Sequence, residues 1–193
     1  MKSDKGQILG KKTEIRKEIT GLLRDQSPEI REERSGIIQN KLLSDGEFRT
    51  SNTVMVYVSL PTEVSTYLII NTALELGKRV VVPYVNEISQ TMTSVEIAST
   101  EDLVVGPYGI YQPKESLKTR EISLKEIDLV IVPALAFDKD NMRLGRGKGY
   151  YDKFLSSEEL SSVRSIGLAF QFQILDEVPC APHDRPVTKV ITD

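Results

Sequence analysis

Residues 53–85 read TVMVYVSLPTEVSTYLIINTALELGKRVVVPYV, and this stretch decides the class of fold. Two runs within it, 53–60 and 79–85, are rich in β-branched residues and almost continuously apolar. Such runs are typical of central strands that are covered on both faces. Residues 65–76 between them have helical character and end before Gly77, which tolerates the left-handed backbone that stops a helix. A strand, a helix and a strand predict a βαβ unit, and hence a parallel strand pair with a right-handed crossover.

Further strands are predicted in the second half of the chain. Leu129–Ala136 (LVIVPALA) and Ser165–Phe170 (SIGLAF) are again apolar runs, and Thr91–Ile97 is an additional candidate strand. Ser99–Pro113 holds two glycines and two prolines and is predicted to be loop. Strands and helices that alternate in this way predict a three-layer α/β fold.

Two helices are predicted before the first strand. The first has apolar residues at i, i+4, i+7 and i+8, namely Ile15, Ile19, Leu22 and Leu23. Ser27-Pro28 is typical of a helix start, because serine caps a free amide and proline lacks the amide that would go unpaired. The apolar side of this second helix is predicted to consist of Ile30, Ile37, Ile38 and Leu42.

Length and composition favour one soluble domain over residues 1–193, with 39% hydrophobic and 27% charged residues. The net charge of −3 argues against a sequence-independent nucleic-acid binder, which would normally be basic. The single cysteine excludes an internal disulfide and fits a reducing compartment. No apolar run is long enough to span a bilayer, and the N-terminus lacks the apolar core of a secretory signal. We therefore expect a cytoplasmic protein.

The segment that points to chemistry is Phe137–Asp152, which follows directly from a buried strand and contains RLGRGKGYYD at 143–152. The glycines of RLGRGKGYYD let the backbone approach an anion closely, and its two arginines and one lysine add positive charge. Residues 148–155 have helical character, so the loop leads from the end of a strand into a helix N-terminus, where anions bind. We predict that the segment holds the phosphates of a nucleotide. Asp152 would then lie near enough to carry Mg²⁺ that bridges to those phosphates.

Two common phosphate-binding motifs do not match this segment. No serine or threonine follows Lys148 as in a Walker loop, and the glycine spacing is not that of the dinucleotide fingerprint. The alternative is a flexible basic turn without a ligand. Three glycines and three cations between a strand and a helix favour the binding interpretation.

RLGRGKGYYD after VPALAFD resembles the corresponding segment of the 5-formyltetrahydrofolate cyclo-ligase family, also called 5,10-methenyltetrahydrofolate synthetases. The resemblance covers nearly the whole chain, because other residues of the family pattern occur in the right order. These are Lys12, Arg16, Tyr57-Val58-Ser59, Glu63, Gly109-Ile110, Pro113, Gln173, Pro179 and His183-Asp184.

The resemblance implies a fold, a reaction and two partners. The implied fold is a three-layer α/β/α sandwich with a mostly parallel central sheet, like that of ribose-5-phosphate isomerase and CoA transferases. The implied reaction uses ATP and Mg²⁺ to convert 5-formyltetrahydrofolate to 5,10-methenyltetrahydrofolate, with release of ADP and phosphate. In it the formyl oxygen is phosphorylated and the 10-nitrogen then closes the ring. We further expect a monomer that binds neither nucleic acid nor a membrane.

The resemblance also implies site residues, position by position. The ATP-binding residues would be Lys12, Arg16, Arg143, Leu144, Gly145, Arg146, Gly147, Lys148, Gly149, Tyr150 and Tyr151. The substrate-binding residues would be Val58, Glu63, Arg146, Gly147, Lys148, Gly149 and Tyr150. Arg146 and Lys148 would be catalytic, and Asp152 and Asp184 would be the magnesium carboxylates.

The chain departs from the family pattern at two positions that bear on the site. Asn141 replaces a glycine before Arg143, and asparagine tolerates left-handed geometry, so the turn is expected to survive. Thr188 stands where an aspartate is frequent, which puts a role for that carboxylate in doubt.

Several of these residues also have ordinary structural interpretations. Lys12 and Arg16 alone would be a solvated basic helix face, and Glu63 alone would be a charge favoured by a helix dipole. His183 is expected to be a turn residue and not a general base. Cys180 has no basic neighbour within two positions, so it is not expected to be a nucleophile.

Two rival functions stay open from the sequence. One is a paralogue with the same ATP loop and another substrate, since function belongs to the site and not to the fold. The other is a non-enzymatic nucleotide- or RNA-binding module that uses the RGKG stretch. A further hypothesis is that the N-terminal helix closes over ATP when both substrates bind.

Overall fold

The computed structural model describes residues 2–181 and 184–193. Its centre is a six-stranded sheet in the order β11-β9-β6-β1-β2-β3. The strands are β1 (Thr53–Val56), β2 (Arg79–Asn86), β3 (Thr91–Ile97), β6 (Leu129–Val132), β9 (Arg164–Leu168) and β11 (Lys189–Ile191). All neighbours pair in parallel except β2 and β3, which form an antiparallel pair. The predicted parallel sheet and the candidate strand at 91–97 are therefore confirmed.

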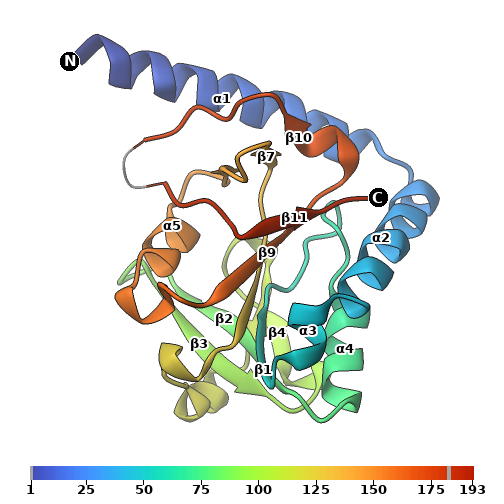
Figure 1. Ribbon diagram of the computed structural model, residues 1–193. Coiled ribbons are helices and arrows are strands. Elements are labelled where there is room, and N and C mark those ends of the chain that lie inside the picture. The colour runs from blue at the N-terminus through green and yellow to red at the C-terminus, as the bar shows by residue number, and fades with distance from the viewer. Residues whose placement is uncertain (1, 182–183) are drawn as a thin grey trace.

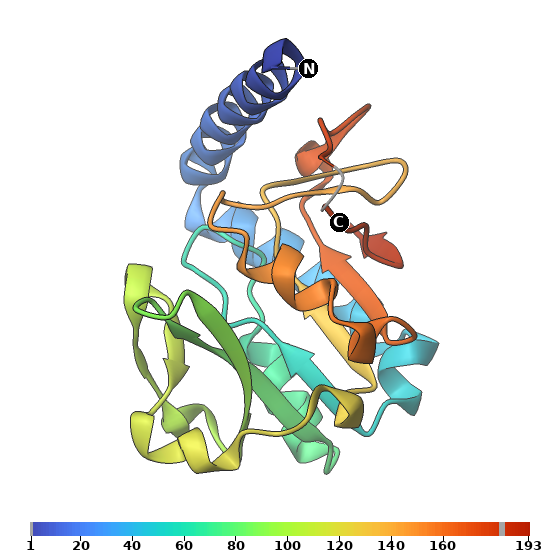
Figure 2. The ribbon, with the colours of Figure 1, turned by 90° about the vertical axis from the view of Figure 1, so that its left-hand side faces the viewer.

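Helices cover both faces of this sheet (Figures 1 and 2). The helices are α1 (Lys2–Asp25), α2 (Pro28–Leu43), α3 (Gly46–Thr50), α4 (Tyr67–Glu75) and α5 (Tyr150–Leu155). The second, third and fourth lie on one face and α5 lies on the other, while α1 crosses beyond one end of the sheet. The predicted three-layer α/β/α sandwich is confirmed. No helix in the described part of the chain combines the length and the apolar character needed to cross a membrane.

The core explains why the strand sequences are almost continuously apolar. Val54 and Val56 of β1 belong to one buried cluster, while Met55 between them belongs to the other. Side chains alternate between the faces of a strand, so a strand covered on both faces must be apolar at every position. All three side chains are completely buried.

The start of α2 follows the prediction, but its buried side does not. Ser27 Oγ accepts a hydrogen bond from the backbone N–H of Ile30 at 3.3 Å, and Pro28 is the first helical residue. Ile30 and Ile37, predicted to be buried, are 47% and 42% exposed. The residues of α2 that are buried are Ser35, Ile38, Gln39 and Leu42. This set follows the i, i+3, i+4, i+7 spacing of one helix face and leaves out the other two isoleucines.

The face of α1 was predicted more accurately. Ile19 and Leu23 are each 1% exposed and join the larger core cluster. Ile15 packs against that cluster while partly buried. Leu22, which was predicted to share this face, is 43% exposed.

The first predicted strand is shorter than its apolar run. β1 ends at Val56, although residues 57–60 continue the pattern. The side chain of Thr66 takes the place of a neighbouring strand here: its Oγ1 donates to the carbonyl of Tyr57 at 2.7 Å and accepts from the N–H of Ser59 at 3.1 Å. Local side-chain bonds of this kind compete with a sheet ladder and end the strand.

The run at 129–136 is divided between two sheets. β6 ends at Val132, before Pro133, which has no N–H to donate to a ladder. The chain then enters β7 (Ala136–Asp138), the middle strand of a small sheet with β8 (Arg143–Leu144) and β10 (Ile174–Leu175). The loop between β7 and β8 contains Asn141 at φ +60°, so the left-handed turn expected there is confirmed.

The prediction of an irregular loop at 99–113 was wrong. β4 (Leu103–Val105) and β5 (Tyr111–Pro113) form a two-stranded antiparallel sheet. The glycine and proline residues belong to the tip of this hairpin and its end. A Cβ at Gly106 would come within 2.5 Å of the side chain of Gln112, so a larger residue there would have to displace that side chain.

The last strand of the sheet is held by contacts with the first half of the chain. Lys189 of β11 forms an ion pair with Asp45 at 2.7 Å. Lys41 of α2 donates to the carbonyl of Thr192 at 2.7 Å, and Arg34 lies 3.5 Å from the carboxylate of Asp193. The C-terminal edge of the sheet is thus fixed by residues from α2 and its C-terminal connection.

Candidate active site

A cavity of about 320 Å³ lies where three parallel strands end. Tyr57 and Val58 follow β1, Pro133 and Ala134 follow β6, and Val85 lies near the end of β2. The tip of the β4–β5 hairpin and the glycine segment 143–152 complete the wall. Ligands in open α/β sheets bind at this end of the strands, so the cavity lies where the topology predicts a site.

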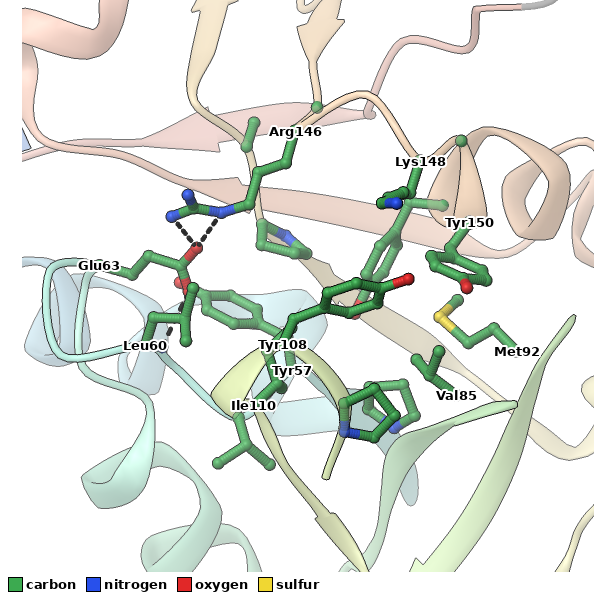
Figure 3. Close-up of a pocket in the computed structure, with 18 of the residues that line it drawn as sticks. Tyr57, Leu60, Glu63, Val85, Met92, Tyr108, Ile110, Arg146, Lys148 and Tyr150 are labelled. Carbon is green, nitrogen blue, oxygen red and sulfur yellow. Dashed lines mark hydrogen bonds and ion pairs between the residues drawn. The ribbon is translucent and has the colours of Figure 1, made fainter. Parts of the chain in front are cut away.

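The cavity has an apolar side and a charged side (Figure 3). Its apolar lining comes from Val58, Leu60, Pro83, Val85, Met92, Pro107, Ile110, Pro133 and Ala134. Its charged lining comes from Glu63, Arg143, Arg146, Lys148 and Asp152. A flat, largely apolar ring would fit the first surface, while an anion would be attracted to the three cations of the second.

The side chain of Glu63 is fixed by two contacts. Both Nε and Nη2 of Arg146 donate to its Oε1, at 3.1 and 2.8 Å. Its other oxygen accepts the N–H of Leu60 at 2.9 Å, so the carboxylate closes the turn that follows β1 (Figure 3). Arg146 is 39% exposed at its side chain and Glu63 only 11%, so the carboxylate is the more buried partner.

Arg143 lies beneath the glycine loop and is almost completely buried. Its guanidinium forms an ion pair with Asp152 and donates to the carbonyl of Pro133 at 3.4 Å. Its Cζ also lies 5.8 Å from the centre of the Tyr151 ring. Its Nε is buried without a hydrogen-bond partner among the described residues. Arg143 therefore connects the end of β6, the loop and the first turn of α5.

The glycines of the loop are needed for different reasons. A Cβ at Gly145 would come within 2.8 Å of Arg143 Nη1, so a side chain there would displace the buried guanidinium. Gly147 and Gly149 have φ values of +103° and +73°, which other residues rarely adopt. α5 begins at Tyr150 and not at Lys148 as predicted, because the left-handed Gly149 is its N-cap.

The first helix contacts the loop from outside the cavity. Arg16 Nε donates to the carbonyl of Gly145 at 2.9 Å, and a Cβ added at Gly147 would meet the Arg16 guanidinium at about ordinary contact distance. Lys12, one turn earlier, is buried and forms an ion pair with Asp184. Asp184 also accepts the N–H of Ala181 at 2.7 Å. The helix is therefore attached to both the glycine segment and the C-terminal segment.

Tyr108 is a cavity residue that sequence reasoning missed. It lies at the tip of the β4–β5 hairpin with φ +59° and reaches across to the glycine segment (Figure 3). Lys148 Nζ lies 5.1 Å from the centre of its ring. Partial burial and a hydrogen bond with Tyr108 raise the pKa of the Tyr150 phenol. An aromatic residue between glycines and prolines was the only signal, and the loop prediction concealed it.

Two further tyrosines lie deeper at the same site. Tyr57 is 4% exposed, and its hydroxyl donates to the carbonyl of Val64 at 3.2 Å, as expected of a core residue. The hydroxyl of Tyr151 is also buried but has no partner among the described residues. Burial raises the pKa of both phenols, and the carboxylate of Glu63 raises them further. Both hydroxyls therefore stay protonated at neutral pH.

Comparison with known proteins identifies the family. Residues 8–193 match the model of the 5-formyltetrahydrofolate cyclo-ligase family. The chain belongs to this family. It is 32% identical to the mouse 5-formyltetrahydrofolate cyclo-ligase over 184 residues, which covers 92% of this chain and 91% of that protein. The Escherichia coli K12 enzyme of the same name is 28% identical, with 86% of this chain and 91% of that protein covered.

Solved structures agree with this assignment. The NMR structure of Aquifex aeolicus 5,10-methenyltetrahydrofolate synthetase superposes with a TM-score of 0.80 at 30% identity, covering 94% of this chain and 89% of that chain. The Mycoplasma pneumoniae 5,10-methenyltetrahydrofolate synthetase gives a TM-score of 0.73 at 24% identity, with 94% of this chain and 98% of that chain covered, and supports the fold. The cyclo-ligases are ligase-class enzymes, so this chain is an enzyme. The rival of a non-enzymatic RNA-binding module is set aside.

The structure brings most of the predicted cyclo-ligase site residues into one cavity. Those that line it are Val58, Glu63, Arg143, Gly145, Arg146, Lys148, Gly149, Tyr150, Tyr151 and Asp152. Arg16 lies at the outer side of the loop, where it donates to the Gly145 carbonyl and where a Cβ at Gly147 would meet it. Leu144 is 1% exposed and belongs to the core, so only its backbone can serve a ligand.

The two predicted magnesium carboxylates differ in position. Asp152 lines the cavity and pairs with Arg143, whereas Asp184 pairs with Lys12 and is not part of the lining. Among the residues that the structure describes, no three acidic, histidine or cysteine side chains cluster as metal ligands. Asp152 alone still fits Mg²⁺, which commonly uses one or two carboxylates together with substrate phosphates and water.

The remaining predictions concern residues near the site. Cys180 donates from its thiol to the carbonyl of Val178 at 2.9 Å, and burial raises the thiol pKa, which disfavours a nucleophile. Thr188 Oγ1 accepts the N–H of Ser165 at 3.0 Å, so this residue joins the strand edge where the family pattern has a carboxylate. His183 lies outside the described residues.

Proposed function

We propose that this chain converts 5-formyltetrahydrofolate and ATP to 5,10-methenyltetrahydrofolate, ADP and phosphate, with Mg²⁺ as cofactor. The observation that carries the proposal is one cavity in a cyclo-ligase family member that joins an apolar wall to a glycine loop with three cations. The apolar wall suits a fused ring, and the loop suits a polyphosphate. A reaction between these two ligands needs them to share one cavity.

The folate ring would lie against the apolar wall with Glu63 at its edge. The carboxylate accepts hydrogen bonds only, so it suits the N–H and amino donors of a pterin. Val58 would contact the same ring, because it lines the cavity next to the end of β1. The apolar wall excludes water from this side of the cavity, which strengthens the hydrogen bonds made there.

The triphosphate would lie along the glycine loop. Arg146 and Lys148 line the cavity directly and can contact the transferred phosphoryl group. Arg16, which already donates to the Gly145 carbonyl, would act from α1 at the outer side of the loop, and Lys12 would have to leave its ion pair with Asp184 to reach the phosphates. Arg143 is buried beneath the loop, so it would act indirectly: it would hold the loop backbone in place, and the N–H groups of that backbone would contact the phosphates.

Phosphorylation turns the formyl oxygen, which is a poor leaving group, into part of a phosphate that can leave. The formyl oxygen attacks the γ-phosphorus, the bond to the β–γ bridging oxygen breaks, and ADP leaves. The resulting iminium carbon carries a phosphate ester in place of a carbonyl oxygen. The 10-nitrogen adds to this carbon and loses its proton, and the C–O bond breaks to release phosphate. The product is the cyclic methenyl cation.

The protein's part in this reaction is mainly positioning and charge neutralisation. Arg146 and Lys148 would neutralise charge on the γ-phosphoryl oxygens as the bond to ADP breaks. Mg²⁺, held by Asp152 and the phosphates, would supply further positive charge at the β- and γ-phosphates. Tyr57 and the buried hydroxyl of Tyr151 would limit access of bulk water to the inner end of the cavity, which disfavours transfer of the phosphoryl group to water.

The test follows the near-ultraviolet absorbance of the methenyl product after the protein is mixed with 5-formyltetrahydrofolate, ATP and Mg²⁺. We expect product only when all three are present, and a loss of roughly 10²–10³-fold in kcat for Arg146→Ala. Arg24→Ala is the matched control, because this arginine on α1 is 76% exposed. If the wild type binds ATP but forms no product, the enzyme acts on another substrate and the proposal is wrong.

We also propose that the enzyme acts in the cytoplasm as a single chain. The one cysteine fits a reducing compartment.

A further inference from the structure

Two residues that the proposed function places at different ligands are bonded to each other in this structure. Arg146, which would neutralise the γ-phosphoryl oxygens and also border the folate, donates twice to Oε1 of Glu63, which would contact the folate ring. The two residues are 83 positions apart in the chain and both line the same cavity (Figure 3). The contact occupies Nε and Nη2 of Arg146 and Oε1 of Glu63, so each side chain has fewer groups left for its proposed ligand while the contact is intact.

The two partners differ in their freedom to move. Glu63 is 11% exposed at its side chain, and Leu60 N–H holds its second oxygen at 2.9 Å. Arg146 is 39% exposed and stands between Gly145 and Gly147, which has φ +103°. Opening the contact therefore moves the arginine, while the carboxylate stays in place.

We propose that the Glu63–Arg146 ion pair is a lock that couples folate binding to nucleotide binding. This inference rests on the proposed function, because it needs both ligands. Donors on the folate ring replace the guanidinium at Glu63, and phosphate oxygens replace the carboxylate at Arg146. The first ligand to bind breaks the ion pair, and the second finds its residue already released.

The thermodynamic result is positive cooperativity between the two ligands. Each must tighten the binding of the other by the same factor, because the free energy of breaking the pair is spent once. The pair is partly exposed, so its strength is modest and the coupling is expected to be about fivefold. An enzyme coupled in this way holds ATP weakly until folate arrives, which limits the transfer of phosphate to water.

The decisive measurement is the Kd of a non-hydrolysable ATP analogue with Mg²⁺, determined by calorimetry without folate. Glu63→Gln removes the charge that holds Arg146, so the analogue should bind about fivefold more tightly than to the wild type. Saturating 5-formyltetrahydrofolate should tighten binding to the wild type by a similar factor. Glu96→Gln is the matched control, since Glu96 pairs with Arg79 at 2.7 Å, outside the cavity lining.

A double-mutant cycle separates the lock from a general effect of charge. In the Arg146→Ala background, Glu63→Gln should change the Kd of the analogue by less than twofold, because the arginine that it releases is absent. If Glu63→Gln still tightened binding of the analogue fivefold in that background, the charge of Glu63 would be acting on the nucleotide without Arg146. That result would overturn the lock.

Two other outcomes would also overturn it. One is that Glu63→Gln binds the ATP analogue with an unchanged or a larger Kd than the wild type, which is the result expected if Glu63 only maintains the structure of the site. The other is a wild type in which folate leaves the Kd unchanged. The proposed function fails separately, if the wild type forms no methenyl product, so the two failures are distinguishable.

Discussion

Replacing Tyr151 by phenylalanine is expected to make the ligand-free protein more stable. The Tyr151 hydroxyl is buried and has no hydrogen-bond partner among the described residues. A buried hydroxyl without a partner costs about 1–3 kcal/mol relative to water. Phenylalanine keeps the ring, which packs edge-on against Phe154 at 6.4 Å and faces Arg143. The change removes only the unpaired group.

The size of the effect follows from these numbers. Recovery of about 1 kcal/mol corresponds to a rise of roughly 2–4 °C in the midpoint of thermal unfolding for a chain of this length. Tyr57→Phe is the matched control, because that hydroxyl donates to the buried Val64 carbonyl at 3.2 Å. Its loss should lower stability by about 1–2 kcal/mol, or roughly 2–8 °C.

Thermal unfolding followed by circular dichroism, without ligands, measures both variants. The expected result is opposite signs for two chemically identical substitutions in the same cavity. A fall in the midpoint of Tyr151→Phe similar to that of Tyr57→Phe would show that the Tyr151 hydroxyl does have a partner. The reasoning from its unpaired state would then be refuted.

Three further predictions concern the loop, the N-terminal helix and pH. Gly147→Ala should lower the free energy of unfolding by about 1–2 kcal/mol, because φ is +103° at this position and alanine is strained there. It should also raise the KM for ATP. Urea unfolding and steady-state kinetics measure the two effects, and an unchanged free energy of unfolding would contradict the backbone strain. Asp184→Asn should lower the free energy of unfolding, measured in urea, by about 3–5 kcal/mol, because it leaves the Lys12 ammonium buried without its countercharge. An unchanged midpoint of urea unfolding would contradict this stabilising role of the ion pair. A hydrogen bond from Arg79 lowers the pKa of Glu126 below its ordinary 4.5. The ionised carboxylate therefore stabilises the folded protein above pH 4.5, and this contribution is lost as the pH falls through the lowered pKa. The midpoint difference between wild type and Glu126→Gln should therefore shrink from pH 7 toward pH 3, and a constant difference would contradict it.

The sheet could be predicted from the sequence because its strands are buried on both faces. Met55 between Val54 and Val56 leaves no polar position, and this pattern is distinctive. The ends of the strands could not be predicted in the same way. β1 ends because the side chain of Thr66, ten positions after Val56, hydrogen-bonds the backbone of Tyr57 and Ser59. The apolar pattern of the run does not indicate such a hydrogen bond.

The glycine segment could be predicted because its composition is unusual, and most of its residues do line one cavity. The contribution of the β4–β5 hairpin could not, because its strands have three residues each and the position of Tyr108 depends on how the hairpin folds over. Lys12 illustrates a second difficulty. Spacing along a helix predicts which face it shares with Arg16, but not that Asp184, 172 positions away, would be its partner.

The ties between early and late segments bear on how the protein forms during translation. β11 completes the edge of the sheet, and residues 184–193 contact α1 and α2 through Lys12, Arg34 and Lys41. A chain still on the ribosome has made both helices long before those partners leave the exit tunnel. The inner strands can pair during synthesis, but α1, which supports the glycine loop through Arg16, cannot be fully anchored until residue 184 has emerged. Assembly of the catalytic centre therefore waits for the segment around residue 184, even in a domain whose inner strands can pair earlier.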